Sequence, residues 1–294
     1  MKLKKLFVLF LTLLTPLCLA ENTFALPPQV DSSVLEKEKS KIVKLETTYN
    51  TRDLGGYKTS DGKITKYGVF LRSDDTDNLT LKDIETLKSY GVTAVLDLRE
   101  SPYYLEHPDK FSNIPGINYQ NIDIVKIYNE HSTDKETRSD ESSARKFLYY
   151  TGEGNWVKTA FDIIADTEGC TLFHCFAGKD RTGLLAMLLL GLVDVSAEDI
   201  MQNYSVSYDL IKENPKIKAI IEKDIKNFGE AAIGKYHATP PSKIKHGIDY
   251  ISENYGTTEN YLLACGVSKR NLEKIKNRFV RESEDKQFYI YSNL

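Results

Sequence analysis

The sequence predicts an α/β protein, and three features of the chain lead to that fold class. An apolar strand, an amphipathic helix and a second apolar strand follow one another between residues 68 and 98, which is the order of an α/β layer. A third apolar strand runs directly into a strongly apolar helix after residue 170. The final third of the chain repeats helix caps and helical spacing of apolar residues, so we expect it to be helical.

The first elements surround a turn. Residues 50–57 read Asn-Thr-Arg-Asp-Leu-Gly-Gly-Tyr, and paired glycines after an Asx residue are typical of a tight turn. We expect a strand at 68–73 and a buried strand at 92–98. Between them, Thr80 is a helix cap and Gly91 ends the helix. The apolar positions of this helix recur at helical spacing: Leu81, Ile84, Leu87 and Tyr90.

The middle of the chain changes from polar to strongly apolar. Residues 121–154 are crowded with charged side chains, which predicts either a solvated helix or loop, or a lid over a nearby site. A helix is expected at 155–166, a buried strand at 171–174 and the central helix at 182–193. Later helices are expected from 196 onward and at 214–228, 242–254, 257–264 and 268–281.

Composition narrows the class of protein. The chain has 294 residues, is 41% hydrophobic and carries a formal net charge of -3, values that indicate a globular protein. No long basic run follows residue 5, so we expect no nucleic-acid partner.

The N-terminus predicts export. Lysines near the start precede an apolar stretch from Leu6 to Ala20, and the small residues Ala20 and Ala25 are candidate cleavage positions. Residues 1–25 are therefore interpreted as a secretory signal peptide, and a secreted or extracytoplasmic protein is expected. The apolar run is shorter than the ~20 residues that span a bilayer, so we expect no stable membrane insertion after the leader is removed. A charged lead-in segment follows at 26–47.

The cysteines indicate a free thiol. Removal of the leader leaves Cys170, Cys175 and Cys265, an odd number in a compartment where thiols tend to pair. Cys170 and Cys175 lie on one apparent strand, and if that strand is extended the two thiols are beyond the reach of a disulfide. At least one thiol must remain unpaired within the chain, and it is a candidate for chemistry. Cys170 and Cys265 are expected to be core thiols.

One stretch has the pattern of an anion-binding loop. Residues 174–183 read His-Cys-Phe-Ala-Gly-Lys-Asp-Arg-Thr-Gly, between the buried strand and the apolar helix. Successive backbone N–H groups of such a loop point inward, and the N-terminus of the helix adds positive potential, which suits a phosphate dianion. Gly178 allows the chain to wrap closely, and Gly183 allows the helix to approach the sheet.

Cys175 and Arg181 bracket this loop, and we expect both to be catalytic. Arg181 can donate two parallel hydrogen bonds to phosphate oxygens. The positive surroundings favour the thiolate of Cys175, which can attack phosphorus. His174 is expected to orient the loop, and Thr182 to donate its hydroxyl to the sulfur. The chemistry requires no metal and no cofactor.

Further residues are expected at the substrate. Within the loop they are His174, Phe176, Ala177, Gly178, Lys179, Thr182 and Gly183. Arg52 and Asp53 belong to the earlier turn, where they either pin the turn itself or brace the phosphate loop from behind. Asp97 and Arg99 are expected to form a structural pair at a strand end.

These motifs together resemble the protein tyrosine and dual-specificity phosphatases, above all a bacterial subgroup with the loop His-Cys-x-Ala-Gly-Lys-Asp-Arg-Thr-Gly. Further matches are Thr51–Tyr57, Leu71–Ser73, Val95–Arg99 and Tyr261–Leu272, so the resemblance spans about residues 48–280. It implies one cysteine-phosphatase domain at 48–294, with a central, mostly parallel sheet flanked by helices. It also implies hydrolysis of phosphotyrosine, with phosphoserine, phosphothreonine and phosphoinositides as further substrates.

The resemblance also implies roles for two loop residues. In the subgroup the aspartate inside the loop is the general acid, which transfers to Asp180. Relatives outside the subgroup use an aspartate on a mobile loop, a position that Asp134 or Asp140 would fill. Stabilising the helix dipole as a cap is the alternative role of Asp180. Lys179 resembles the lysine of phosphatases that favour inositol lipids, and its alternative is a solvated surface charge.

Other functions compete with a phosphatase. A rhodanese-like sulfurtransferase also cradles an anion around a cysteine, but Arg181 and Thr182 behind Cys175 argue against it. A non-catalytic module that binds phosphorylated ligands is the second alternative. Such a module can lack the nucleophile or the arginine, whereas this sequence has both Cys175 and Arg181, which favours an enzyme. A nucleotide-binding P-loop is excluded because Asp180 follows Lys179 where serine or threonine is required. The expected partner is a phosphorylated protein or a phosphoinositide, and no oligomeric state is predicted.

Overall fold

A five-stranded sheet forms the centre of the molecule. The computed structural model describes residues 30–131, 148, 151, 152 and 154–283. In spatial order the strands are β1 (Arg52–Asp53), β3 (Phe70–Ser73), β6 (Cys170–His174), β4 (Val92–Asp97) and β5 (Asn118–Asn121). β1 runs antiparallel to β3, and the other pairings are parallel. The predicted α/β class and mostly parallel sheet are confirmed.

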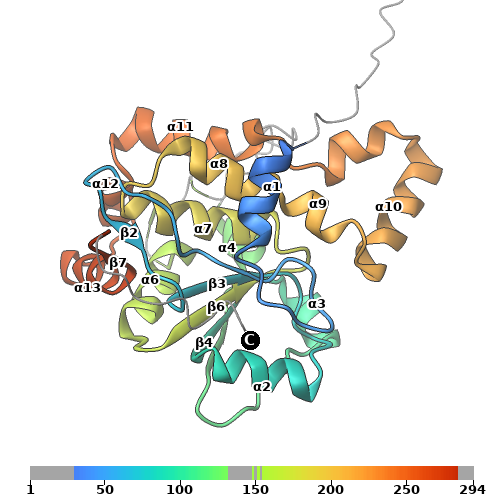
Figure 1. Cartoon of the computed structure of the whole chain (residues 1–294), viewed down its shortest axis with the longest axis horizontal. Helices are drawn as coiled ribbons and strands as arrows, with labels where there is room; N and C mark the ends of the chain where they lie inside the picture. Colours follow the sequence, from blue (N-terminus) through green and yellow to red (C-terminus); the bar gives the residue numbers. More distant parts are fainter. Residues whose placement is uncertain (1–29, 132–147, 149–150, 153, 284–294) are drawn as a thin grey trace, which may run out of the picture.

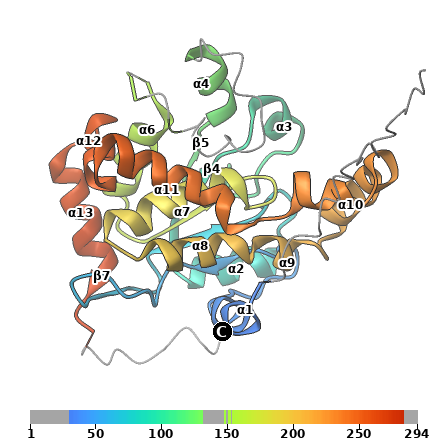
Figure 2. The same ribbon diagram turned by 90° about the horizontal axis from the view of Figure 1, so that it is seen from above.

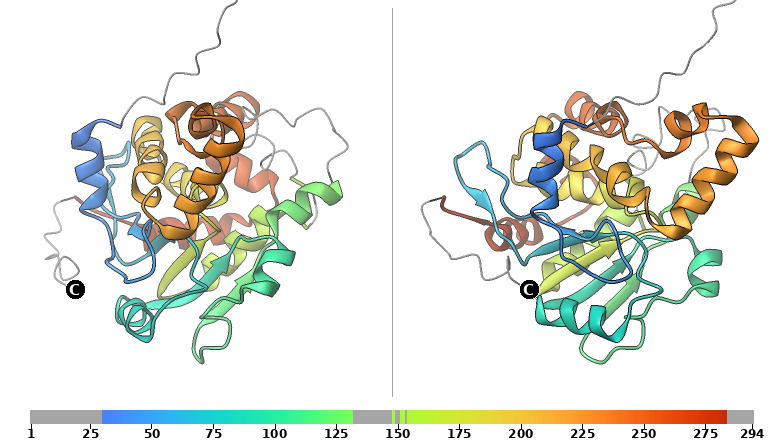
Figure 3. Two further views of the ribbon diagram at one scale, coloured as in Figure 1. Left: turned by 90° about the vertical axis from the view of Figure 1, so that its right-hand side faces the viewer. Right: turned by 45° about the vertical axis from the view of Figure 1, so that its right-hand side comes forward.

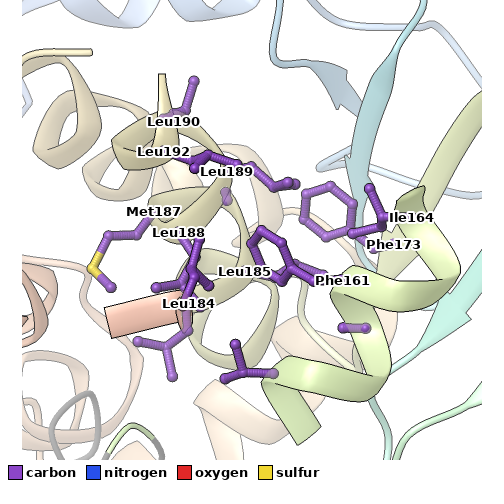
Figure 4. Close-up of a cluster of buried hydrophobic side chains, with 14 of the residues drawn as sticks. Phe161, Ile164, Phe173, Leu184, Leu185, Met187, Leu188, Leu189, Leu190 and Leu192 are labelled. Carbon is purple, nitrogen blue, oxygen red and sulfur yellow. The ribbon is translucent and has the colours of Figure 1, made fainter. Parts of the chain in front are cut away.

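Alternation along the strands divides the core into two clusters. All residues of β6 are buried, and successive side chains point to opposite faces of the sheet. Leu172 lies opposite Leu71 of β3 and Val95 of β4, and all three belong to one cluster. Phe173 belongs to the larger cluster on the other face, where Figure 4 shows it beside Phe161.

Helices cover both faces of this sheet (Figure 1). On one face lies α2 (Leu81–Ser89), which begins with a capping box formed by Thr80 and Asp83. The opposite face carries α6 (Trp156–Asp166) and α7 (Asp180–Leu192). Around these two pack α8 (Ala197–Ser205), α11 (Pro241–Tyr255), α12 (Thr258–Ala264) and α13 (Lys269–Phe279). The flanking helices and the helical final third agree with the prediction.

α7 is the central helix of the larger layer. Its leucines are buried on nearly every side because the sheet, α8, α11 and α12 surround it. The helix begins at Asp180, whereas residue 182 was the predicted start, so that boundary was wrong. Lys179 occupies the N-cap position without a capping side-chain bond, and no local sequence signal marks this start. Asp180 and Arg181 therefore belong to the first turn of α7.

The chain after α8 extends from the body of the molecule. It forms α9 (Ser207–Ile211), α10 (Pro215–Phe228) and the π-helical turn η2 (Ile233–His237). Asn214 caps α10 through its side chain, and Pro215 opens the first turn. Figure 2 shows α10 projecting at the end of the molecule opposite to α12 and α13.

Strand pairing overrode the local pattern at one expected boundary. Residues 268–281 were expected to form one helix, but α13 ends at Phe279. The next residues form β7 (Val280–Arg281), which pairs antiparallel with β2 (Ile64–Thr65). The turn at 50–57 contains β1, which pairs with β3. Such short strands depend on a partner distant in the sequence, which a local pattern does not reveal.

Part of the charged lead-in is docked on the domain. It contains α1 (Ser32–Lys39), which Figure 3 shows beside α8. Lys37 forms an ion pair with Asp199 of α8 at 2.6 Å. Glu38 is fully buried, and the Lys41 ammonium lies 2.8 Å from its carboxylate.

The polar middle segment begins after β5. Between β4 and β5 lies the short helix α3 (Ser101–Glu106), and α4 (Ile124–His131) follows β5. Asp134 and Asp140 lie outside the described residues, as does the predicted leader. Within the described ranges, no helix combines the length and apolar character needed to cross a bilayer.

Candidate active site

The loop at residues 175–179 connects the end of β6 to the N-terminus of α7. Cys175 directly follows the strand and is 3% exposed. Gly178 has a φ of 63°, and a Cβ there would lie 2.4 Å from the carbonyl oxygen of Ser73. Only glycine therefore permits the loop to approach β3 this closely.

Asn50 and Arg72 hold this loop from its buried side. The Asn50 side-chain amide donates to the carbonyl oxygens of Ala177 and Gly178 at 3.1 and 3.0 Å. Arg72 Nη2 donates to the Gly178 carbonyl at 2.7 Å. In a trans peptide the N–H points away from the C=O of the same peptide group. The carbonyls of Ala177 and Gly178 are held on the buried side, so the N–H groups of residues 178 and 179 face the open side of the loop. The loop is thereby prepared for an anion on its open side.

Arg52 supports the loop indirectly, through Asn50. It donates to the backbone oxygen of Asn50 at 3.2 Å and also to the side-chain oxygen of that residue. A second donation reaches the carbonyl oxygen of Asn203 in α8 at 2.5 Å. Of the two expected roles of Arg52, the contacts favour bracing from behind, with Asn50 as the intermediary.

Asp53 holds the glycine turn instead. Its carboxylate accepts from the backbone N–H groups of Gly55 at 2.6 Å and Gly68 at 2.8 Å, and from the Tyr90 hydroxyl at 2.6 Å. Burial raises the pKa of Asp53 to about 6, although these bonds oppose the shift. These contacts connect Asp53 to the turn and to α2, and the structure does not bring it to the substrate side of the loop.

Asp74 joins the loop support to α10. It accepts from the N–H groups of Tyr49 and Asn50 at 3.1 and 3.0 Å. The side-chain amide of Asn214, the cap of α10, donates to it at 3.1 Å. Burial raises the pKa of Asp74 to about 6 against the effect of these bonds.

His174 lies behind the loop and is completely buried. Its Nε2 is 3.1 Å from Asp109 and 3.8 Å from Asp97, and its Nδ1 is 3.4 Å from the Cys175 carbonyl oxygen. Burial lowers the pKa of His174, but the two carboxylates outweigh burial and raise it to about 9. The structure therefore puts His174 where it can orient the loop, and not where a substrate could touch it.

Asp97 and Arg99 form a buried ion pair at the end of β4. Arg99 Nη2 lies 2.7 Å from Asp97, and Nη1 lies 2.8 Å from Asp75. Asp97, Asp109 and His174 are close enough together to ligate a cation. The protonated His174 and the guanidinium of Arg99 supply the positive charge that these carboxylates require. Burial raises the pKa of Asp97, but these two cations outweigh burial and hold it below its ordinary value.

Arg181 projects from the first turn of α7 and its side chain is 15% exposed. Its Nη1 donates to the Leu98 carbonyl oxygen at 3.0 Å and to the Glu100 carboxylate. Burial lowers the pKa of Arg181, but the neighbouring Cys175 and Glu100 outweigh burial and hold this pKa above its ordinary value. Arg181 and Cys175 are thus electrostatically coupled across the loop.

Asp180 is the neighbouring residue in that turn. Its carboxylate accepts from the Tyr204 hydroxyl at 2.9 Å and lies 3.5 Å from the Lys179 ammonium. Burial favours the protonated form, but Lys179, Lys243 and Tyr204 hold the pKa of Asp180 below its ordinary value. Asp180 is therefore ionised at neutral pH in the free protein. The N-cap position of α7 belongs to Lys179, so Asp180 is not the cap.

Lys179 is not a solvated charge. Its side chain is 8% exposed, and its ammonium donates to the carbonyl oxygens of Tyr236 at 2.9 Å and His237 at 3.1 Å. Lys179 thereby ties the phosphate loop to η2. Two of its three N–H groups are used in this tie.

Thr182 and Gly183 differ from their expected contacts. The Thr182 hydroxyl is buried and has no hydrogen-bond partner in the described part of the chain, so the expected bond to Cys175 is not formed in this structure. A Cβ on Gly183 would lie 2.8 Å from the Tyr204 ring. Gly183 therefore makes room chiefly for α8, which brings the Tyr204 hydroxyl to Asp180, while the contact with Arg72 of β3 on the sheet is looser.

A pocket of about 210 Å³ opens on the front of the loop. Cys175, Asp180 and Arg181 line it together, and so do Phe176, Ala177, Lys179 and His237. Its opposite wall is apolar and comes from α9 and α10: Tyr208, Ile211, Ile217 and Ile220. The expected catalytic residues therefore meet at one cavity.

The sequence analysis missed most of the groups around the loop. Asn50 and Arg72 lie within or beside the quoted motifs, but nothing in a local pattern shows that they reach the carbonyls of residues 177 and 178. Glu100 follows a strand motif and carries no signal of its contact with Arg181. The apolar wall residues look like ordinary core positions of amphipathic helices.

The pocket lies within the part of the chain that a family model matches. A sequence model described as "Tyrosine phosphatase family" matches residues 43–281. A tyrosine-protein phosphatase of Nostoc commune is 30% identical over 223 residues, which cover 71% of this chain and 74% of that protein. The triple specificity protein phosphatase PtpB of Mycobacterium tuberculosis is 23% identical over 279 residues, which cover 80% of this chain and 98% of that protein.

Proposed function

Because the chain belongs to the tyrosine phosphatase family, we propose that it is an exported, cysteine-dependent phosphatase that hydrolyses phosphotyrosine through a phosphocysteine intermediate. Membership of the family makes it a hydrolase of phosphorylated substrates. The roles of individual residues, the intermediate, the preferred substrate and export go beyond membership.

One observation carries the assignment of the residues. Cys175, Asp180 and Arg181 line the same pocket at the N-terminus of α7. A nucleophile, a proton donor and a bidentate anion receptor are what phosphate monoester cleavage requires. The positive end of the helix dipole adds to the attraction for a phosphate dianion.

The proposed reaction has two displacements at phosphorus. The Cys175 thiolate attacks in line, the bond from phosphorus to the ester oxygen breaks, and Asp180 gives its proton to that oxygen. Arg181 and the loop amides hold the other phosphate oxygens as charge redistributes. Water then attacks the phosphocysteine, Asp180 accepts its proton, and inorganic phosphate and the thiolate are released. The Thr182 hydroxyl, which lacks another partner among the described residues, is available to the departing sulfur.

Asp180 must carry a proton in the first step, although its pKa is low in the free protein. A bound phosphate dianion would raise the pKa of the nearby carboxyl group by like-charge repulsion. Asp134 and Asp140, which lie outside the described residues, are the alternative acids.

The wall of the pocket supports phosphotyrosine as the preferred substrate. Tyr208, Ile211, Ile217 and Ile220 offer an apolar surface to an aromatic ring beside the phosphate. Phosphoserine, phosphothreonine and phosphoinositides are further candidates. The cations near Asp180, Lys179 and Lys243, favour a polyanionic head group, but both ammonium groups already donate to backbone carbonyls.

Cys175→Ser is the decisive test. The variant should lose turnover of a phosphotyrosine peptide by a factor of about 10⁴ or more, because an alcohol cannot replace the thiolate. Cys265→Ser is the matched control and should keep its activity. Iodoacetate near neutral pH should label Cys175 and not Cys265, since burial raises the pKa of Cys265 to about 12. Turnover that survives Cys175→Ser would refute the mechanism.

Asp180→Asn tests the acid. The variant should slow hydrolysis of alkyl and phenyl phosphates about 100-fold and affect nitrophenyl phosphate far less, because a good leaving group needs no proton. An equal rate for all these esters would move the role to another carboxyl group.

Export rests on the leader at residues 1–25 alone. N-terminal sequencing of the protein from the producing cells should begin after Ala20 or Ala25. An intact N-terminus on cell-retained protein would contradict export without affecting the proposed chemistry.

A further inference from the structure

Glu100 is the acidic side chain that contacts the phosphate-binding arginine. It lies between β4 and α3, and its carboxylate accepts from Nη1 of Arg181. The Glu100 side chain is 42% exposed, whereas that of Arg181 is 15% exposed. The pair therefore joins Arg181, which lines the catalytic pocket, to a partly exposed carboxylate outside the pocket lining.

The contact occupies one particular part of the guanidinium. Nη1 donates both to Glu100 and to the Leu98 carbonyl oxygen at 3.0 Å. An arginine has five N–H donors, of which Nη1 holds two. Among the described residues, none accepts from Nε or Nη2 of Arg181. These two nitrogens form one edge of the guanidinium, with the fork geometry that matches two oxygens of a phosphate.

The residues that hold Nη1 are themselves fixed. Leu98 and Glu100 flank Arg99, which is fully buried in its ion pairs with Asp97 and Asp75. The Asn121 side-chain amide donates to the carbonyl oxygens of Asp97 and Arg99, both at 3.0 Å. The segment that reaches Arg181 is thus anchored at Asp97 and Arg99, next to the two groups that hold Nη1.

We propose that Glu100 is a positioning residue, which holds Nη1 of Arg181 so that the Nε and Nη2 edge faces the phosphate. The inference rests on the proposed phosphatase function for its consequence in catalysis. A competing effect is electrostatic, because a carboxylate beside the pocket repels a phosphate dianion. The two effects predict opposite changes when Glu100 is removed.

The test measures binding of inorganic phosphate by calorimetry and turnover of a phosphotyrosine peptide. Glu100→Ala should weaken phosphate binding about tenfold and raise KM by a similar factor, because the fork is no longer held in register. Glu100→Gln keeps an acceptor oxygen at the same reach and should stay within about twofold of the native protein. Glu100→Asp, one methylene shorter, should resemble Glu100→Ala.

Glu106→Ala, an exposed change at the other end of α3, is the control and should leave both quantities unaltered. Tighter phosphate binding in Glu100→Ala and Glu100→Gln would mean that repulsion dominates, and would overturn the inference. If phosphate binding were unchanged and kcat fell only for esters with poor leaving groups, Glu100 would be a general acid, and this result would also overturn the inference. If the native protein binds phosphate but turns over no ester, the proposed function fails while the phosphate data still decide the role of Glu100.

Discussion

The two sides of the phosphate loop are built on opposite principles. Behind the loop, Asn50, Arg72 and His174 are fully buried and donate to its carbonyls or lie against them. In front, the cavity has an apolar wall from α9 and α10, including Ile220, which is 38% exposed. From this difference we infer that hydrogen bonds to the carbonyls on the buried side of the loop leave its N–H groups available on the open side. Electrostatic preorganisation of this kind costs no rearrangement when the anion arrives.

Loss of a buried cation behind the loop should give the largest effect. Arg72→Met leaves the side-chain oxygen of Asn203 without its donor and the Gly178 carbonyl with Asn50 as its remaining side-chain donor, so the free energy of unfolding should fall by about 4 kcal/mol. Turnover should fall as well because the loop loses its shape. Urea denaturation followed by the fluorescence of Trp156, the single tryptophan, measures the change.

Arg270→Met, an exposed change on α13, is the matched control and should alter stability by less than about 0.5 kcal/mol. If Arg72→Met were as stable as this control, the buried side would not be the rigid half of the comparison.

The charge on His174 makes the buried side sensitive to pH. The folded-state pKa is raised to about 9, above the unfolded value near ~6.5, so the folded protein holds a proton that the unfolded chain loses between these values. This contribution is complete below pH ~6.5 and is lost as pH rises through about 9, at a cost of up to about 3 kcal/mol. Unfolding free energies measured across this range should decline with pH.

His174→Gln should flatten the decline between pH ~6.5 and about 9, since glutamine does not titrate in this range. A profile as steep as that of the native protein would show that other groups cause the decline.

Lys179 tests the boundary between the two sides. Lys179→Met removes the donor to the Tyr236 and His237 carbonyls, which should lower stability by about 1.5 kcal/mol and speed amide exchange in residues 233–238. Because Lys179 ties the loop to η2, the variant should show a KM about threefold higher, both for a phosphotyrosine peptide and for inositol phosphates. A loss restricted to the polyphosphorylated substrates would instead make Lys179 a ligand.

The open side should be the most tolerant. Ile220→Ala removes part of the apolar wall and should raise KM for an aryl phosphate about twofold, with stability within about 0.5 kcal/mol of the native value. Leu263→Ala, at a similar exposure on α12, is the control and should leave KM unchanged. A severe loss of stability in Ile220→Ala would show that the wall belongs to the rigid core.

Local patterns predicted most of the elements that position the site. The capped helix after Thr80, the buried strand before Cys175 and the long apolar helix after it are all present. Their signals are short range, because caps, apolar spacing and glycine turns act within a few residues of one another. Short paired strands such as β1 and β7 were missed, since their stability comes from partners far along the chain.

The sequence by itself determined the chemical content of the loop: a cysteine, an arginine and an aspartate spaced around a glycine turn between a strand and a helix. Only the tertiary structure decided what each of these groups contacts. Lys179 faces carbonyls of η2, Asp180 faces Tyr204 of α8, and Arg181 faces Glu100 beyond β4. The physical reason is that hydrogen bonds and ion pairs depend on atoms brought together by sheet order and helix packing, which no spacing along the chain encodes.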